Sequence, residues 1–302
     1  FEKITNNTMP TLKDSLFLLH RPEKGEELLK IENFEHIAQQ RLIIEELAAQ
    51  QLSLLKIKAD RKTNSCNIFS INNLSRKSED MFGVDLHDIS LTIKQGSIVG
   101  IAGVAGNGQD ELMELLIGEV EAPADSLIFK GEDVGRLNSH ERRQLSMFFI
   151  PEERLGHGAV PDMGLHENML LSRPEQSEMT NYGVINWQNV EKLTQQVIDD
   201  FKVQTQSSKM LAKSLSGGNL QKFMVGRELI QNPELLIVSQ PTWGVDAGSE
   251  NNIHQSLIAL ADQGSAILII SQDLDEILTL CEQIHVLSEG SLSAAVDMRK
   301  MA

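Results

Sequence analysis

The stretch GVAGNGQDE, residues 103–111, determines how the rest of the chain is interpreted. It follows the apolar run IVGIA (98–102) and leads into QDELMELLIG (109–118), whose leucines fall on one helical face. A strand, a glycine loop and a helix in this order are the context of a phosphate-binding loop. Its glycines would let the backbone turn and aim N–H groups at phosphate oxygens, beside a helix N-terminus with partial positive charge. They are Gly103, Gly106 and Gly108.

Two residues of this loop depart from an ordinary phosphate loop. Gln109 stands where a lysine would neutralise phosphate charge, and Asp110 stands where a hydroxyl would hold Mg²⁺. Gln109 can donate a hydrogen bond but has no charge, and Asp110 would either touch the metal or repel the phosphates. For the loop taken alone, a tight turn that binds nothing is the plain alternative.

The composition excludes some classes of protein. The chain has 43 acidic and 27 basic residues, for a net charge of −16, which argues against nucleic acid as the main partner. The two cysteines, Cys66 and Cys281, lack metal-site spacing and fit a reducing, cytosolic compartment. No apolar run approaches the roughly 20 residues of a membrane span. No secretory signal opens the sequence, which starts at Phe1, so we expect a fragment or a processed product.

The pattern of apolar runs predicts an α/β fold. Residues 67–101 alternate like short strands, and the runs LLIV (235–238) and AILII (266–270) are the length of buried strands. A helical stretch, 249–263, separates these two runs. A strand, a helix and a second strand in this order predict a parallel sheet.

An internal repeat is also suggested. MPTLKDSLFLLHRPEK (9–24) is similar to VPDMGLHENMLLSRPEQ (160–176), and amphipathic helices follow an aromatic residue in both copies. The matched residues are Pro10 with Pro161, Pro22 with Pro174, and Phe34 with Trp187. Chance similarity between leucine-rich helices is the alternative. Only the second copy continues into SLSGGNLQK, so the first copy is interpreted as a remnant.

Three further motifs follow the glycine loop. LSGGN (215–219), before Gln221 and Lys222, places a serine and two glycines at a predicted helix start, either as an anion site or as an ordinary helix cap. LLIVSQPTWGVD (235–246) ends a strand in Ser239 and Gln240, where an Asp for Mg²⁺ and a Glu to polarise water would be expected. AILIISQDLDEI (266–277) has Gln272 where a histidine would be expected.

In this order the motifs resemble the ATP-binding-cassette (ABC) ATPases over about residues 67–290. FIPEERLGHG (149–158) is similar to a segment in the second cassette of tandem importers for simple sugars and nucleosides. Gln109 and Gln240 match the nucleoside branch of that family, whereas four residues depart further from a working site. These are Asp110, Ser239, Trp243 and Gln272.

The resemblance implies an α/β P-loop NTPase core with a parallel sheet, a small antiparallel β-subdomain near 67–100 and a helical subdomain near 160–215. Residues 67–302 would form the ABC nucleotide-binding domain, with a degenerate nucleotide site. Residues 1–66 would be a linker plus a remnant of the first cassette's helical subdomain, which 9–64 resemble.

The family's site residues carry over by position. Phe82 would stack on adenine, although a core aromatic is as good an interpretation of it. Glu152 would replace the glutamine that senses the metal and the membrane partner, and Asp246 would lie at the dimer seam. The loop around the ATP phosphates would comprise Gly103, Gly106, Asn107, Gly108, Gln109, Asp110 and Glu111. The signature residues that reach a partner's nucleotide would be Ser216, Gly217 and Gly218.

No catalytic residue is assigned, because Ser239, Gln240 and Gln272 are degenerate, and Asp110 is the one candidate metal ligand. The resemblance implies an ATP-binding subunit of a nucleoside or simple-sugar importer at the cytoplasmic face of the inner membrane. It would bind ATP and Mg²⁺ weakly, contact membrane permease subunits, pair head to tail with another cassette and serve a solute-binding protein indirectly. Little or no ATP hydrolysis is expected from this chain alone. The alternatives are a soluble tandem ABC protein of translation or repair and a decayed, inactive cassette.

Overall fold

The computed structural model describes residues 15, 66–78, 81–172, 179–181 and 184–298. The chain divides into two compact units, Phe1–Ile57 and Lys58–Ala302, and the elements named below belong to the second. The predicted remnant, 1–66, and with it the first copy of the proposed repeat, lies outside the described residues apart from Ser15 and Cys66.

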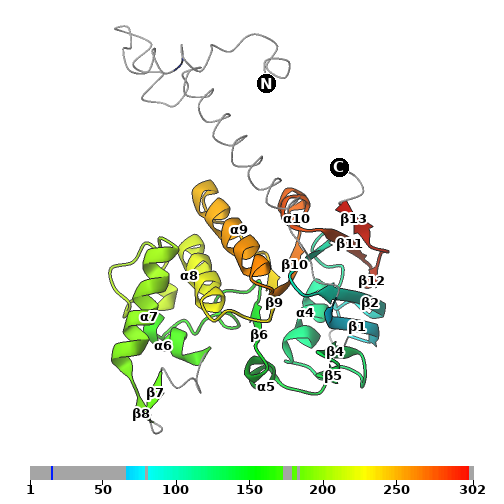
Figure 1. Cartoon of the computed structure of the whole chain (residues 1–302), viewed down its shortest axis with the longest axis horizontal. Coiled ribbons are helices and arrows are strands. Elements are labelled where there is room, and N and C mark those ends of the chain that lie inside the picture. Colours follow the sequence, from blue (N-terminus) through cyan, green and yellow to red (C-terminus); the bar gives the residue numbers. More distant parts are fainter. Residues whose placement is uncertain (1–14, 16–65, 79–80, 173–178, 182–183, 299–302) are drawn as a thin grey trace. The chain divides into compact units, whose positions relative to one another are not determined.

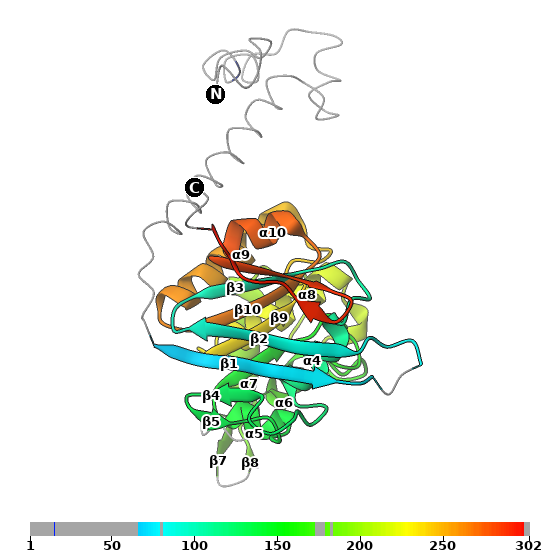
Figure 2. The ribbon, with the colours of Figure 1, turned by 90° about the vertical axis from the view of Figure 1, so that its right-hand side faces the viewer.

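A parallel sheet forms the core of the second unit (Figure 2). Four of its five strands are apolar and fully buried, as expected for parallel strands covered on both faces. The predicted parallel pairing of the runs at 235–238 and 266–270 is confirmed. In spatial order the strands are β11 (Gln283–Ser288), β3 (Ile98–Ala102), β10 (Ala266–Ser271), β9 (Leu235–Ser239) and β6 (Met147–Ile150).

The predicted antiparallel sheet is confirmed, but it is continuous with the core. Its strands pair in the order β5, β4, β1, β2, and the short β12 (Ser291–Leu292) connects β2 to β11. The sheet therefore has 11 strands, with β13 (Val296–Asp297) paired to β11. The antiparallel strands are β1 (Asn67–Arg76), β2 (Leu86–Lys94), β4 (Leu127–Phe129) and β5 (Glu132–Asp133).

Helices cover the core and extend it on one side (Figure 1). The predicted helical subdomain is confirmed by α6 (Leu165–Leu171) and α7 (Trp187–Asp200), which pack on each other, and α7 also packs on α8. A short hairpin that the sequence did not predict lies between them, formed by β7 (Thr180–Asn181) and β8 (Val184–Ile185). The other helical elements are α4 (Gln109–Ile117), α5 (Ser139–Gln144), η1 (Ala212–Ser214), α8 (Gly217–Leu229), α9 (Ala247–Asp262) and α10 (Leu274–Leu280).

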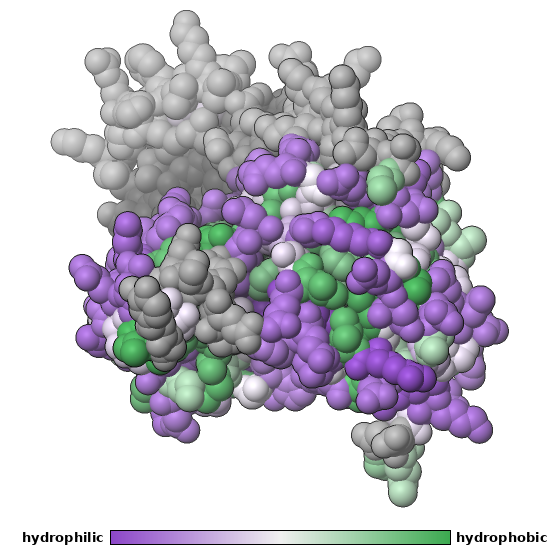
Figure 3. All heavy atoms as spheres, turned by 60° about the horizontal axis from the view of Figure 1, so that its bottom comes forward, coloured by the Kyte–Doolittle hydropathy of each residue, from purple (hydrophilic) through white to green (hydrophobic). Residues whose placement is uncertain are grey.

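One face of the second unit is mainly hydrophilic (Figure 3). Purple residues cover most of the face in Figure 3, and apolar residues form smaller patches between them. None of the helices in the described ranges combines the length and the apolar character that a membrane crossing requires.

Helix α4, which follows the glycine loop, is held at its C-terminal end by Arg142. This fully buried side chain donates from Nη1 to the carbonyls of Leu115 and Leu116, both at 2.6 Å, and from Nη2 to the carbonyl of Gly135 at 3.0 Å. Burial lowers the pKa of Arg142 to about 10. Because these carbonyls include unpaired groups of the last helical turn, Arg142 acts as a cap.

We therefore expect Arg142→Ala to lower the free energy of unfolding by about 2–3 kcal/mol, since it leaves buried carbonyls without a charged donor. Urea denaturation of the full chain measures this. Arg136→Ala, at an exposed arginine six residues earlier, is the control and should change it by less than about 0.5 kcal/mol. Equal effects of the two substitutions would mean that α4 is not anchored by Arg142.

Candidate functional site

The loop 103–108 presents a backbone cradle at the start of α4. Gly106 and Gly108 have φ of 80° and 105°, in the region that favours glycine. A Cβ on Gly106 would meet nothing within 4 Å, so this glycine is required by its conformation and not by lack of space. No side chain caps the N-terminus of α4. The backbone therefore has the form of an anion-binding loop.

The side chain of Gln109 folds back onto this loop. Its Nε2 donates to the carbonyl of Val104 at 2.9 Å, and its Oε1 accepts from the backbone N–H of Asn107 at 3.0 Å. The residue is 8% exposed and lies against Gly103, where a Cβ would be 2.5 Å from Nε2. The amide thus uses an N–H group of the loop and supplies no positive charge.

Carboxylates gather beside the loop. Burial raises the pKa of Asp110, and the negative charges of Glu111 and Glu114 raise it further. Burial also raises the pKa of Glu152, followed by the charge of Asp110, while Arg154 and a hydrogen bond with Ser239 oppose the rise. A pocket of about 240 Å³ has both carboxylates in its lining. Its other lining residues include Glu114, Glu119, Glu153 and His157.

Phosphate and Mg²⁺ fit this site unequally. The backbone cradle suits a phosphate, but the adjacent carboxylates and the absence of a lysine at position 109 oppose one electrostatically. Across the described parts of the chain, no group of three or more His, Cys, Asp or Glu side chains could hold a metal ion. Asp110 as a metal ligand stays a prediction. We assign no catalytic step to this loop.

The substituted residues of the later motifs lie around the same loop. A pocket of about 50 Å³ lies between the glycine loop, the segment 149–158 and the ends of β9 and β10. Its lining residues include Gln109, Asp110, Glu152, Ser239, Gln240 and Gln272. Gln240 is buried with φ of 49°, and its Oε1 accepts from Ser271 Oγ at 3.3 Å. The side-chain amides of Gln240 and Gln272 can neither act as a general base nor carry a positive charge at neutral pH. Gln272 itself is exposed.

The signature stretch 215–219 lies on the surface at the start of α8, as predicted. Exposed Ser216 is the N-cap, and its Oγ accepts from the backbone N–H of Asn219 at 3.4 Å and from Asn219 Nδ2 at 2.9 Å. Gly218 touches the loop after β9, because a Cβ there would be 2.5 Å from the carbonyl oxygen of Gly244.

Asp246 ends that loop and caps α9. Its carboxylate accepts from the backbone N–H of Ser249 at 3.0 Å and from Ser249 Oγ at 2.7 Å, and these bonds lower the pKa of Asp246. Lys222 Nζ, on α8, is 3.9 Å from Asp246 Oδ2. The contacts of Gly218 and of Lys222 thus join the signature helix to this loop.

Phe82 is 91% exposed, so the interpretation of this residue as a core aromatic is wrong. Glu111 accepts from the backbone N–H of Val84 at 2.7 Å and so ties the segment that follows Phe82 to α4. No sequence motif predicts this contact of Glu111 with Val84, which lies outside the phosphate loop itself.

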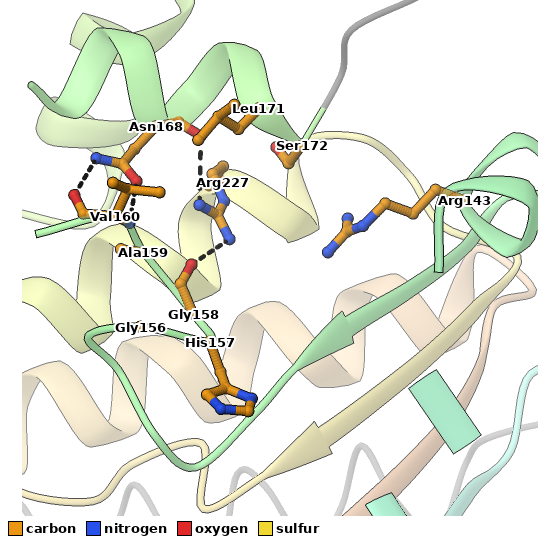
Figure 4. A pocket seen from close by; sticks show the side chains of 10 residues that line it. All are labelled: Arg143, Gly156, His157, Gly158, Ala159, Val160, Asn168, Leu171, Ser172 and Arg227. Atoms are coloured by element: carbon orange, nitrogen blue, oxygen red, sulfur yellow. Dashed lines mark hydrogen bonds between the residues drawn. The ribbon is translucent and has the colours of Figure 1, made fainter. Parts of the chain in front are cut away.

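Sequence reasoning also missed a buried charge cluster beside a third pocket, of about 130 Å³, whose lining includes Arg143 and Arg227 (Figure 4). Glu228 accepts from Arg143 Nη1 at 2.8 Å and from Arg227 Nε at 2.9 Å, and Arg227 Nη2 donates to the carbonyl of Gly158 at 3.0 Å. Burial alone would raise the pKa of Glu228, but the two guanidinium groups outweigh it and hold that pKa low. No motif marks these residues, which lie in ordinary helical stretches.

Arg154, in the segment 149–158, was missed as well. Its Nε donates to Gln221 Oε1 at 3.1 Å, and its guanidinium also donates to the carbonyl of Trp243. These contacts connect the segment that carries Glu152 to α8 and to the loop after β9.

Comparison with known proteins identifies a family and several relatives that this chain resembles. The family model described as ABC transporter matches residues 86–243. The chain is 36% identical to the guanosine import ATP-binding protein NupO of Bacillus subtilis and 34% identical to the nucleoside import ATP-binding protein NupA of Lactococcus lactis, over 76% of this chain and 45% of either relative. It is 31% identical to the galactose/methyl galactoside import ATP-binding protein MglA 2 of Photobacterium profundum, over 79% of this chain and 47% of that protein.

The chain therefore spans about half the length of these curated relatives. Solved structures share its fold. A nucleotide-free ATP-binding cassette of an ABC transporter has a TM-score of 0.64 at 21% identity, over 78% of this chain and 94% of that one. A dimeric bacterial ABC transporter cassette has a TM-score of 0.66 at 18% identity, over 77% and 99%.

The proximity of the two carboxylates predicts a coupled titration. We expect Asp110→Asn to lower the pKa of Glu152 toward its ordinary value of 4.5, because the Asp110 charge that helps burial to raise it is removed. Side-chain NMR titration of the carboxyl carbons measures this. The pKa of Asp246, which is held low by Ser249, is the internal control and should stay unchanged.

The same carboxyl makes stability depend on pH. Since the pKa of Glu152 is raised on folding, its stabilising contribution is present below about pH 4.5 and is lost as pH rises through the folded value. The stability of Glu152→Gln relative to the unaltered chain should therefore increase from pH 4 to pH 7. A difference that does not vary with pH would contradict the raised pKa.

Proposed function

The chain belongs to the ABC transporter family of ATP-binding proteins, and from that premise we propose that it is one cassette of an importer for nucleosides or simple sugars. In this proposal it presents an intact signature to a partner cassette, while its own nucleotide site is degenerate and binds ATP and Mg²⁺ weakly. The observation that carries the proposal is the contrast between a phosphate loop closed by Gln109 and a signature whose Ser216 is exposed at the start of α8.

Three observations support the importer class. The relatives are named as import ATP-binding proteins for guanosine, nucleosides and galactosides. The chain matches about half the length of each, as one cassette of a two-cassette protein would. Gln109 and Gln240 also match the nucleoside branch of the resemblance. The partners we propose are permease subunits in the membrane, a second cassette paired head to tail and, indirectly, a solute-binding protein. The chain itself would work at the cytoplasmic face of the inner membrane.

The proposed division of labour follows from the chemistry of the two regions. Phosphate binding at 103–111 would lack the lysine charge and would face the carboxylates of Asp110 and Glu152. Ser239 and Gln240 replace the metal ligand and the general base, and Gln272 replaces a histidine. The isolated chain should therefore hydrolyse ATP at or near background. The signature needs only Ser216, Gly217 and Gly218 at a helix N-terminus to meet a partner's γ-phosphate.

The order of two mutational effects tests the proposal. In a complex with a complete partner cassette and permease, Ser216→Arg should abolish ATP turnover, because the arginine adds bulk and misplaced charge at a closed seam. Gln109→Ala should reduce turnover much less, since this loop already lacks its cation. Phosphate release at saturating ATP measures both, and the isolated chain gives the background rate.

The reverse order would contradict the proposal, because it would place hydrolysis at this chain's own loop. An unchanged rate in both variants would favour a decayed cassette. Failure of the chain to assemble with any permease, together with normal turnover, would favour a soluble tandem ABC protein.

A further inference from the structure

Arg154 lies where three segments of the chain meet. It belongs to the stretch that follows β6, its Nε donates to Gln221 on α8 at 3.1 Å, and its guanidinium donates to the backbone carbonyl of Trp243. Gly217 is directly beside it, since a Cβ at that position would be 2.4 Å from Arg154 Nη1. One side chain thus contacts the signature helix and the loop after β9 together.

Gln221 completes the same link from the other side. It is 1% exposed, and its Nε2 donates to the carbonyls of Gln240 at 3.1 Å and Pro241 at 3.0 Å. Its Oε1 is left to accept from Arg154. The carbonyls of Gln240, Pro241 and Trp243 therefore all accept hydrogen bonds from this pair of side chains. Arg154 and Gln221 are also hydrogen-bonded to each other.

The two signature glycines lie in close contact with these segments. Arg154 takes the space that a side chain at Gly217 would need, and the carbonyl of Gly244 takes the space at Gly218. A larger residue at Gly218 would push against backbone, whereas one at Gly217 would displace the Arg154 guanidinium. The close packing and the Arg154 hydrogen bonds therefore act in the same direction, which is to hold 215–219 against 240–246.

Arg154 is also close in sequence to a residue that lines the pocket beside the phosphate loop. It is two residues from Glu152, whose carboxylate lines the pocket beside the phosphate loop. Burial lowers the pKa of Arg154, and the charge of Glu152 opposes that shift. A displacement of this segment would thus move both the pocket lining and the support of the signature.

We propose that Arg154 is a positioning residue that locks the signature loop 215–219 to the segment 240–246 and thereby sets where Ser216 meets the partner cassette's nucleotide. The inference rests on the proposed function, since it concerns the signature that this chain would present. Arg154 itself touches no nucleotide in this account and acts through Gln221, Gly217 and the Trp243 carbonyl.

The local part of the proposal can be tested in the full chain without a partner. The chain has two tryptophans, so Trp187→Phe leaves Trp243, which is 59% exposed, as the single fluorophore. In that background Arg154→Ala should lower the fluorescence anisotropy of Trp243 and speed amide exchange in 216–221 and 241–245. Arg136→Ala, at an exposed arginine outside this link, should change neither signal.

The positioning part is tested in the complex with a partner cassette. Arg154→Ala should lower kcat for ATP about 10- to 100-fold with little change in KM, because ATP would bind mainly to the partner's loop and only its reaction would need the signature in place. Arg154→Lys should recover part of kcat, since an ammonium can still reach one of the two acceptors. Gly217→Ala should resemble Arg154→Ala, and the double variant should be no worse than either one.

The outcomes separate this inference from the function on which it rests. Unchanged Trp243 anisotropy and amide exchange in Arg154→Ala would overturn the lock. Loosened loops with unchanged kcat, in a complex that Ser216→Arg still inactivates, would overturn the positioning role and leave the proposed function standing. Normal turnover in Ser216→Arg would overturn the proposed function, and the positioning role with it. A rise in KM in Arg154→Ala as large as the expected fall in kcat would also count against Arg154 as a positioning residue.

Discussion

The alignment of three parallel strand ends is the constraint on which the candidate site depends. Ala102 at the end of β3 pairs with Ser271 at the end of β10, and Ile270 of β10 pairs with Ser239 at the end of β9. The residues that follow therefore emerge side by side at one edge of the sheet, where ligands bind in open α/β folds. Positions 103, 240 and 272 are adjacent for this reason, although they are far apart in the sequence.

That alignment makes the chemistry of the edge depend on a few side chains. A lysine, an aspartate, a glutamate and a histidine there would favour bound phosphate and metal. Amides and a serine stand in their places, with two carboxylates beside the loop, so the edge opposes anions while keeping a backbone shaped for them. The signature is on a different element, α8, and its surface position does not depend on these substitutions. In the proposed function, one region of the cassette has therefore lost its chemistry while the other keeps its form.

The sequence predicted the parts of the fold that depend on local patterns. Long apolar runs located β9 and β10, the leucine face and Gly118 delimited α4, and Ser216 marked the start of α8. It could not predict that β12 joins the two sheets, because two residues carry no periodicity. The conformation of Gln109 and the partners of Arg154 were also beyond it. The hydrogen-bond partners of long side chains depend on which acceptors the folded chain places nearby, such as the carbonyl of Trp243 for Arg154.

The division of labour between the two cassettes can be tested by measuring where nucleotide becomes trapped in the assembled complex. With vanadate and a photoreactive ATP analogue, we expect about one trapped nucleotide for each pair of cassettes, cross-linked to the partner's phosphate loop and, on this chain, to the segment around Ser216. Two trapped nucleotides for each pair, or a cross-link to residues 103–111 of this chain, would contradict this division of labour.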